Sequence, residues 1–89
     1  MKFKLGRLLA TPVALEAILE AGENPATYID RHAAGDWGEV CADDRKANED
    51  ALVLGERLLS AYSLKSDEKI WIITEADRSA TTVLTPAEY

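Results

Sequence analysis

The sequence predicts an α+β fold in which helices come first and an antiparallel sheet follows. Three observations indicate this: two helix starts that each place proline after a capping residue, a change after Arg57 to runs rich in apolar, aromatic and β-branched residues, and short polar breaks between those runs. The 89 residues suffice for one modest core, so we expect a single domain over residues 1–89.

The N-terminal segment predicts a short strand followed by a helix. Residues 2–9 begin with alternating Lys and apolar side chains, and Gly6 interrupts the alternation in a way typical of a bulge or bend. Thr11 can cap a helix that starts at Pro12, because proline has no N–H to leave unpaired. Apolar residues then recur at helical spacing as far as Gly22, which favours a stop.

Two more helices are expected before the sheet. Asn24-Pro25 repeats the same start for residues 25–34, which Gly35 ends, and His32 falls on the apolar face of that helix. Acidic residues at 43 and 44 favour the beginning of a third helix, whose apolar stripe runs to Gly55.

The last third predicts a three-stranded antiparallel meander packed against the helices. The strands are expected over residues 57–64, 69–76 and 80–85, joined by short turns and ended by Pro86. Ile70–Thr74 is the most apolar run and should lie centrally, with Ile70, Ile72 and Thr74 on one face. We expect helices to cover one face, and a partner or the N-terminal strand to cover part of the other.

Charge and composition exclude several classes of protein. The net charge of −6 and pI near 4.6 argue against direct binding of nucleic acid through a basic groove. The sequence contains no run of about 18 apolar residues, the length that a membrane-spanning helix needs. Its start also lacks the uninterrupted apolar region of a signal peptide, so we expect a cytoplasmic protein without membrane contact. Cys41 is the only cysteine, which excludes an internal disulfide and favours a small buried residue.

Several stretches, among them "RHAAGDWGEV" and "KIWIITEADRSATTVLTPAEY", resemble a family of small uncharacterised bacterial proteins found with plasmids and other mobile elements. Some of its members are labelled modification subunits of type I restriction enzymes. That label predicts a methyltransferase, but the chain has neither a glycine-rich loop for the methyl donor nor an Asn-Pro-Pro-aromatic motif for a target base. The resemblance therefore implies a mobile-element setting and no reaction.

One set of polar residues suggests catalysis. His32 near a helix end could act as a general acid or base, and Asp36 could hold its tautomer. Arg78, Thr81 and Thr82 could gather around a phosphate, because arginine supplies a planar fork of donors and the hydroxyl groups supply more. This hypothesis is a small metal-independent nuclease- or hydrolase-like enzyme, and it requires His32 and Arg78 to converge.

The same residues also have a structural interpretation. His32 could cap its helix while Trp37 fills the core, and Asp77 could cap a hairpin turn in which Arg78 pairs with Glu75 or Asp77. On this interpretation the leading hypothesis is a non-enzymatic protein-interaction module. Its candidate binding residues are Asp36, Trp37, Glu75, Asp77 and Arg78.

Two further alternatives concern the partner, and two absences limit the chemistry. The acidic charge would suit an inhibitor of a host defence protein or of a nucleic-acid-binding protein, and a homodimer would supply stability that a small core lacks. None of the glycines forms a phosphate-binding loop, so we expect no cofactor. No metal site is expected, because the acidic residues around Asp43 and Asp50 lack the spacing of a calcium loop.

Overall fold

The computed structural model describes residues 1–89 as three helices and one four-stranded sheet. In chain order the elements are β1 (Arg7–Ala10), α1 (Pro12–Glu20), α2 (Pro25–Ala33), α3 (Ala42–Leu54), β2 (Leu58–Ser63), β3 (Lys69–Thr74), β4 (Ala80–Leu84) and a 3₁₀ turn, η1 (Pro86–Glu88). The strands lie in the order β1-β4-β3-β2. The α+β class and the antiparallel β2-β3-β4 meander are therefore confirmed.

The sheet is mixed, because β1 pairs with β4 in parallel. The expected N-terminal strand is present, but it spans Arg7–Ala10 and not residues 2–9. The chain bends sharply at Gly6, whose φ of +66° is costly for residues with a Cβ, and a Cβ there would lie 2.4 Å from the carbonyl oxygens of Arg78 and Ser79. Only glycine fits this approach, so pairing with β4 begins one residue later.

Two of the three helices begin at the expected caps. Thr11 Oγ1 accepts a hydrogen bond from the Ala14 N–H, and Asn24 Oδ1 accepts one from the Ala26 N–H. The third cap was not expected: Cys41 is exposed, and its Sγ accepts from the Asp44 N–H at 3.4 Å. The prediction that Cys41 is buried is wrong, because the residue lies outside the first turn of α3.

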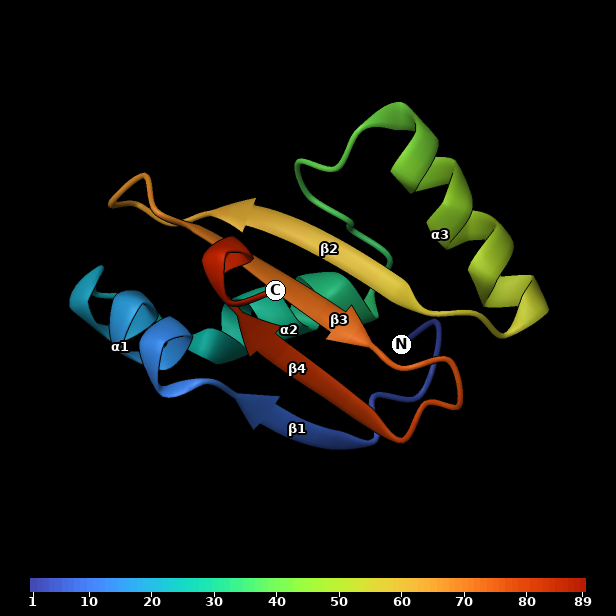
Figure 1. Ribbon diagram of the computed structural model, residues 1–89, viewed down its shortest axis with the longest axis horizontal. Coiled ribbons are helices and arrows are strands. Elements are labelled where there is room, and N and C mark those ends of the chain that lie inside the picture. The colour runs from blue at the N-terminus through green and yellow to red at the C-terminus, as the bar shows by residue number, and fades with distance from the viewer.

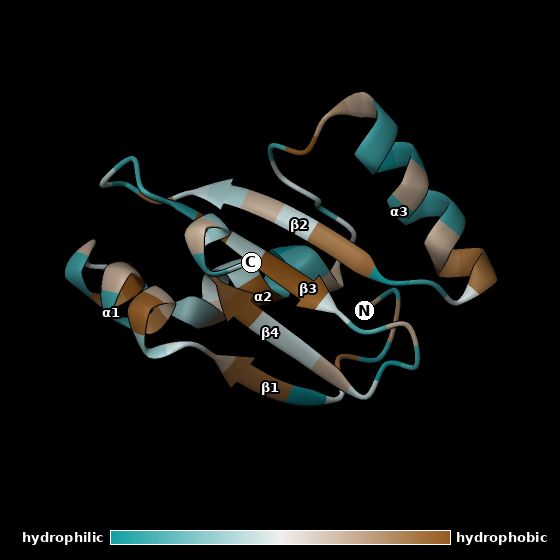
Figure 2. Ribbon diagram, in the orientation of Figure 1, coloured by the Kyte–Doolittle hydropathy of each residue, from teal (hydrophilic) through white to brown (hydrophobic).

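Helices cover one face of the sheet, and the opposite face is largely open (Figure 1). The main core lies between α1, α2 and the strand residues that face them; it comprises Ala14, Ala17, Ile18, Tyr28, Tyr62, Leu64, Ile70, Ile72 and Val83. Helix α3 lies beside β2 instead, over a smaller cluster of Trp37, Ala51 and Leu58. In Figure 2 the strands contain hydrophobic segments, drawn in brown, whereas much of α3 is hydrophilic and drawn in teal.

Only η1 and the C-terminus lie over the second face of the sheet (Figure 1). The ring of Tyr89 packs edge-on against Trp71 at 5.4 Å, and the Arg57 guanidinium lies over Tyr89. The expectation that the N-terminal strand covers this face is wrong, because β1 extends the sheet at its edge. The longest helix, α3, has 13 residues, and none of the helices has the length and apolarity to cross a membrane.

Candidate functional site

His32 lies in a buried chain of polar groups from five segments: α2, β2, β3, β4 and the residues before β1. Its side chain has no exposed surface; Nδ1 lies 2.5 Å from Ser60 Oγ in β2, and Nε2 lies 2.8 Å from Thr74 Oγ1 in β3. Thr74 Oγ1 lies 2.7 Å from Thr81 Oγ1 in β4, which donates to the carbonyl oxygen of Leu5 at 2.7 Å. The helix that ends after His32 thus packs at the end of the sheet where the β3-β4 hairpin begins.

The Leu5 carbonyl sets the direction of every hydrogen bond in this chain. A carbonyl only accepts, so Thr81 donates to it and must accept from Thr74. The Thr74 proton is then used, so Thr74 accepts from Nε2–H of His32. Nδ1 is therefore unprotonated and accepts from Ser60. Asp36 has no part in fixing this tautomer, contrary to the expectation.

The surroundings of His32 keep its imidazole neutral. Burial lowers the pKa of His32 from 6.5 to about 4, because the charged form would lose its hydration. The rings of Phe3 and Trp37 pack edge-on against the imidazole at centroid distances of 5.2 and 5.7 Å. Both ring nitrogens have partners and no pocket reaches them. His32 therefore has no atom to offer a substrate in this structure.

Arg78 holds the β3-β4 hairpin to the end of α3. Its Nη1 donates to the carbonyl of Glu56 at 2.6 Å and to the hairpin carbonyls of Glu75 and Ala76, while Nη2 donates to the carbonyl of Ala51 at 3.1 Å. The Ala51 carbonyl also accepts from the N–H groups of Gly55 and Glu56, and a cationic donor there suits the negative end of the helix dipole. The expected pairing of Arg78 with the side chain of Glu75 or Asp77 is wrong.

The predicted phosphate-binding cluster does not assemble. Phe3 lies between the two basic side chains: its ring is 5.2 Å from His32 and 5.7 Å from the Arg78 guanidinium carbon. Thr81 is buried on the helix side of the sheet, whereas Thr82 pairs with Ile73 and faces the open side. Adjacent residues of one strand point in opposite directions, so the two threonines cannot contact one ligand.

The remaining hairpin residues shape the turn. Asp77 Oδ1 accepts from the Ser79 N–H at 2.9 Å, as the structural interpretation predicted. Hydrogen bonding by Ser79, first by its side chain and then by its backbone, lowers the pKa of Asp77. The Glu75 carbonyl accepts from the Arg78 N–H, and Arg78 has a φ of +61°. Glu75 and Asp77 are exposed, but their backbones close the turn.

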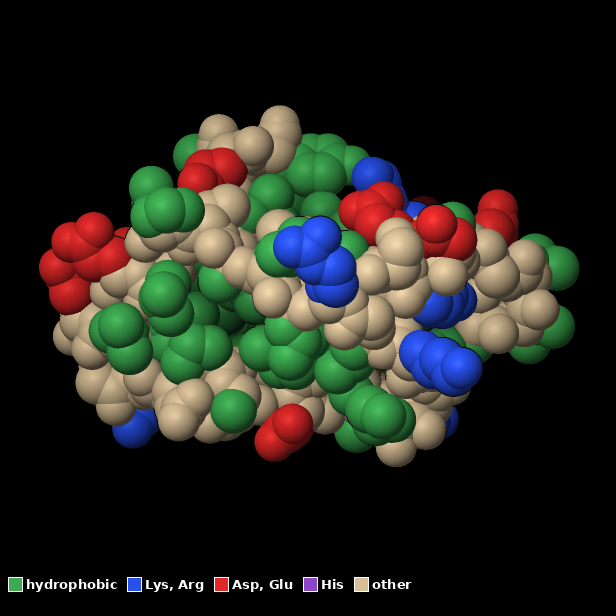
Figure 3. All heavy atoms as spheres, turned by 90° about the horizontal axis from the view of Figure 1, so that it is seen from below, with side chains coloured by type: hydrophobic (Ala, Val, Ile, Leu, Met, Phe, Trp, Pro, Cys, Tyr) green, Lys and Arg blue, Asp and Glu red, His purple; other side chains and the backbone are tan.

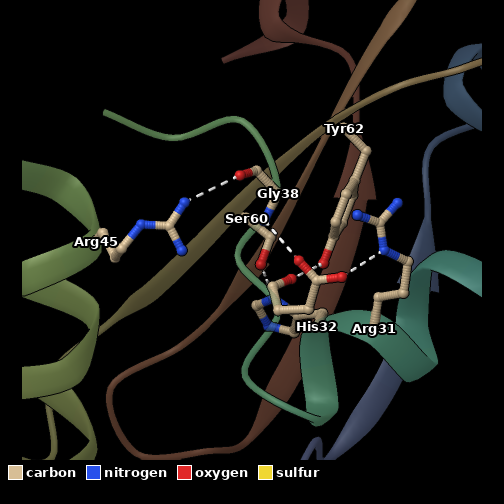
Figure 4. Close-up of polar contacts among 7 residues, drawn as sticks. Arg31, His32, Gly38, Arg45, Ser60 and Tyr62 are labelled. Atoms are coloured by element: carbon tan, nitrogen blue, oxygen red, sulfur yellow. Dashed lines mark hydrogen bonds and ion pairs between the residues drawn. The ribbon is translucent and has the colours of Figure 1, made fainter. Parts of the chain in front are cut away.

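Asp36 and Trp37 anchor the loop between α2 and α3. Figure 4 labels residues around this loop, among them Arg31 of α2, Gly38 in the loop and Tyr62 of β2. The carboxylate of Asp36 pairs with Arg31 at 2.7 Å and accepts from the Gly38 N–H, and Arg31 chiefly lowers its pKa. Trp37 is 1% exposed and donates from Nε1 to Glu49 at 2.7 Å. Trp37 fills the smaller core as the structural interpretation predicted, so it is not available as a contact for a partner.

The same loop seals the outer edge of β2. The Ala61 N–H donates to the Trp37 carbonyl, and the Ala61 carbonyl accepts from the Glu39 N–H at 2.7 Å. Gly38 permits this approach, since a Cβ there would lie 2.0 Å from the Ala61 oxygen. Two residues earlier in β2, the Asn48 amide of α3 bonds to both backbone polar groups of Leu59. This edge therefore has no free pairing site at Leu59 or Ala61.

The edge of β1 is open by contrast. Arg7 and Thr11 donate their N–H groups inward to the carbonyls of Ser79 and Val83. Backbone groups alternate along a parallel ladder, so those of Leu8 and Ala10 point away from the sheet. All four residues of β1 are exposed, with Leu8 at 55% and Leu9 at 41%. An unpaired edge with exposed leucines is a template for another strand.

Apolar side chains continue from β1 onto α1. Figure 3 looks onto this edge and shows hydrophobic side chains gathered along it. Val13 and Leu19 of α1 are 56% and 58% exposed. Groups of exposed apolar residues of this kind mark interaction sites in soluble proteins. We take the β1 edge, defined as Leu8, Leu9, Ala10 and Val13, as the candidate functional site.

Sequence reasoning missed most of these residues. Ser60 had a signal, since it falls between Leu58 and Tyr62 on the inward side of a strand and so needed a buried partner. The sequence also contains a signal for Asn48, because this polar residue lies three positions before Ala51 and so shares the inward face of α3. The open edge of β1 had none, because the pairing partner of a short strand is not encoded locally.

No family model, no curated protein and no solved structure matches this chain. The site is therefore interpreted from its geometry alone. No three His, Cys, Asp or Glu side chains lie together in a way that could hold a metal ion.

Proposed function

We propose that this protein is a small, non-enzymatic interaction module that binds another polypeptide through the β1 edge. The observation that carries the proposal is the contrast between the two edges of the sheet. Asn48 and the Trp37–Glu39 loop occupy the β2 edge, whereas the outward N–H and C=O groups of Leu8 and Ala10 meet no protein group. Addition of a strand to such an edge is a recurrent mode of polypeptide recognition.

The chemistry of the interior supports a binding role over catalysis. His32 is enclosed and neutral, and the Arg78 guanidinium is committed to backbone carbonyls. The mobile-element setting rests on the resemblance of the sequence, and cytoplasmic action belongs to the same proposal. Asp36, Glu75, Asp77 and Arg78 support the fold in this proposal, and the contact residues are those of the β1 edge.

A capture experiment with matched variants tests the proposal. Ala10→Pro removes one outward N–H and no internal hydrogen bond, so the variant should fold while losing the pairing edge. Val53→Asp is the control, because Val53 is 85% exposed at the far end of α3. We expect wild type and Val53→Asp to retain the same partner and Ala10→Pro to lose it. A partner that Ala10→Pro retains would refute a β1-mediated function.

A further inference from the structure

We propose that the polypeptide that pairs with the β1 edge is a second copy of this chain, in an antiparallel arrangement about a two-fold axis at Leu9. This inference rests on the proposed function, since it names the occupant of the same edge. It is carried by three features of the β1 edge: the alternation of its free backbone groups, the apolar side chain of Leu9 at its centre, and the opposite charges near its two ends, Arg7 in β1 and Glu88 of η1 beside Thr11.

The free backbone groups are self-complementary. If Leu9 faces Leu9 of the second copy, Leu8 of each chain lies opposite Ala10 of the other. Leu8 and Ala10 are the residues whose N–H and C=O groups point outward, so each such pair exchanges both hydrogen bonds. The two leucines at the axis then form a non-hydrogen-bonded pair, the arrangement in which facing side chains lie closest.

The charges along the edge select the antiparallel direction. Arg7 stands at the beginning of β1, and Thr11, just past its end, donates from Oγ1 to Glu88 Oε1 at 2.8 Å. Arg7, Leu9 and Thr11 share the open face of the sheet by alternation, which is also the face under η1. The two-fold places Arg7 of one copy opposite Thr11 of the other, and therefore beside Glu88.

A parallel arrangement would require the second copy to be turned over, because only then does its free edge face the first copy. Its Arg7 would lie on the opposite face of the joined sheet and far from Glu88 of the first copy, so the Arg7–Glu88 contact forms only in the antiparallel arrangement. The antiparallel pairing forms its Arg7–Glu88 contact twice, once on each side of the axis. It joins two four-stranded sheets into one, and it covers the most exposed leucines of the edge.

Site-directed cross-linking tests the position of the axis. In a Cys41→Ser background, which keeps a capping side chain at the start of α3, Leu9→Cys should form an intermolecular disulfide under mild oxidation. Facing residues in a non-hydrogen-bonded pair have Cα atoms about 4.5 Å apart, within the range that a disulfide spans. Val53→Cys at the end of α3 is the control and should remain monomeric, although Val53 is more exposed than Leu9, at 85% against 41%.

Sedimentation of the untagged protein over a range of concentrations tests the association itself. Wild type should dimerise, Ala10→Pro should weaken dimerisation roughly tenfold or more by removing a donor from each copy, and Arg7→Glu should weaken it by opposing Glu88. Added salt should also weaken the wild-type dimer, because the charge pairs are exposed. Thermal melting of each variant at a concentration where wild type is monomeric shows whether it remains folded.

The outcomes separate the two proposals. A wild type that stays monomeric, or a Leu9→Cys that cross-links no faster than Val53→Cys, overturns the homodimer. If a different protein is still captured and Ala10→Pro abolishes that capture, the interaction function stands without the homodimer. If Ala10→Pro alters neither dimerisation nor capture, both proposals fall.

Discussion

The side-chain amide of Asn48 bonds to both backbone polar groups of Leu59, donating from Nδ2 to the carbonyl at 2.7 Å and accepting from the N–H at 3.1 Å. A residue of α3 thereby takes the place that a neighbouring strand would take beside β2. Asn48 is 4% exposed, so these two bonds form where water has little access. The helix seals one edge of the sheet, and that leaves β1 as its open edge.

Replacing Asn48 should show the value of this seal. Asn48→Ala leaves a partly buried N–H and C=O unpaired, and we expect a loss of about 2–3 kcal/mol in the free energy of unfolding. Lys46→Ala is the control: it breaks only the exposed pair with Asp50 and should change the free energy by less than about 1 kcal/mol. Urea denaturation measures both. Equal effects would mean that the amide contributes no more than a surface contact.

His32 should make stability depend on pH. Its pKa is about 4 in the folded chain and near 6.5 when unfolded, so the unfolded state binds more protons between these values. Stability should be highest above pH 6.5 and decline as pH falls towards 4, by at most about 1.4 kcal/mol per pH unit. The same ring titrated by NMR should remain neutral at pH 5.5; an imidazolium at that pH would contradict the buried network.

The conservative variant His32→Gln isolates this effect from the carboxyl groups. The pKa values of Asp36, Glu39 and Glu88 are lowered in the folded chain, so their contributions are lost as pH falls through and below their ordinary values of 3.8 and 4.5, at the lower end of the range in which His32 acts. The pKa of Glu20 is raised, chiefly by a side-chain hydrogen bond with Glu16. The effect of Glu20 on the pH dependence of stability therefore has the opposite sign. The variant should be less stable at pH 7 but show a flatter profile between pH 6.5 and 4.5. Chemical denaturation at each pH measures the slope.

Removal of the Arg78 side chain should release the hairpin from α3. We expect Arg78→Ala to lower the free energy of unfolding by about 2–3 kcal/mol, because several carbonyl acceptors lose a charged donor and alanine keeps the unfavourable positive φ. Arg45→Ala is the matched control, since Arg45 makes a single 3.3 Å contact with the Gly38 carbonyl. It should cost less than about 1 kcal/mol. Similar losses in both would contradict the anchoring role of Arg78.

The C-terminal ring should shield one of the two tryptophans. Trp71 lies half-buried under Tyr89, whereas Trp37 is enclosed. Tyr89→Ala should therefore shift the fluorescence of the folded protein to longer wavelength and increase quenching by iodide. The same change in a Trp71→Phe background should have no effect on the remaining emission. A shift that persists there would place the affected tryptophan elsewhere.

The helices and the meander could be predicted because their signals are local. Thr11-Pro12 and Asn24-Pro25 each determine a helix start within a few residues, and the alternation in Ile70–Thr74 places side chains on the correct faces. The parallel pairing of β1 with β4 has no such signal. The strands are about seventy residues apart, and no turn links them.

The site predictions failed for a related reason. Arg78 binds backbone carbonyls, and these have no signature in the sequence. His32 bonds to Ser60 in β2 and Thr74 in β3, and Thr74 bonds in turn to Thr81 in β4, so the network around His32 depends on the register of the whole sheet. The sequence alone does not distinguish a histidine in an exposed cleft from a histidine in such a buried network, because the difference depends on the register of the strands.

The long connection from β1 to β4 also orders events during synthesis. Thr81 bonds to the Leu5 carbonyl across 76 positions of sequence, and Thr11 bonds to Glu88 across 77. β1 leaves the ribosome long before β4, its neighbour in the sheet, so contacts between them must close a very long loop. A nascent chain can form α1 and α2 early, but the strand that presents the leucines is set in place only after residues 80–84 have been translated.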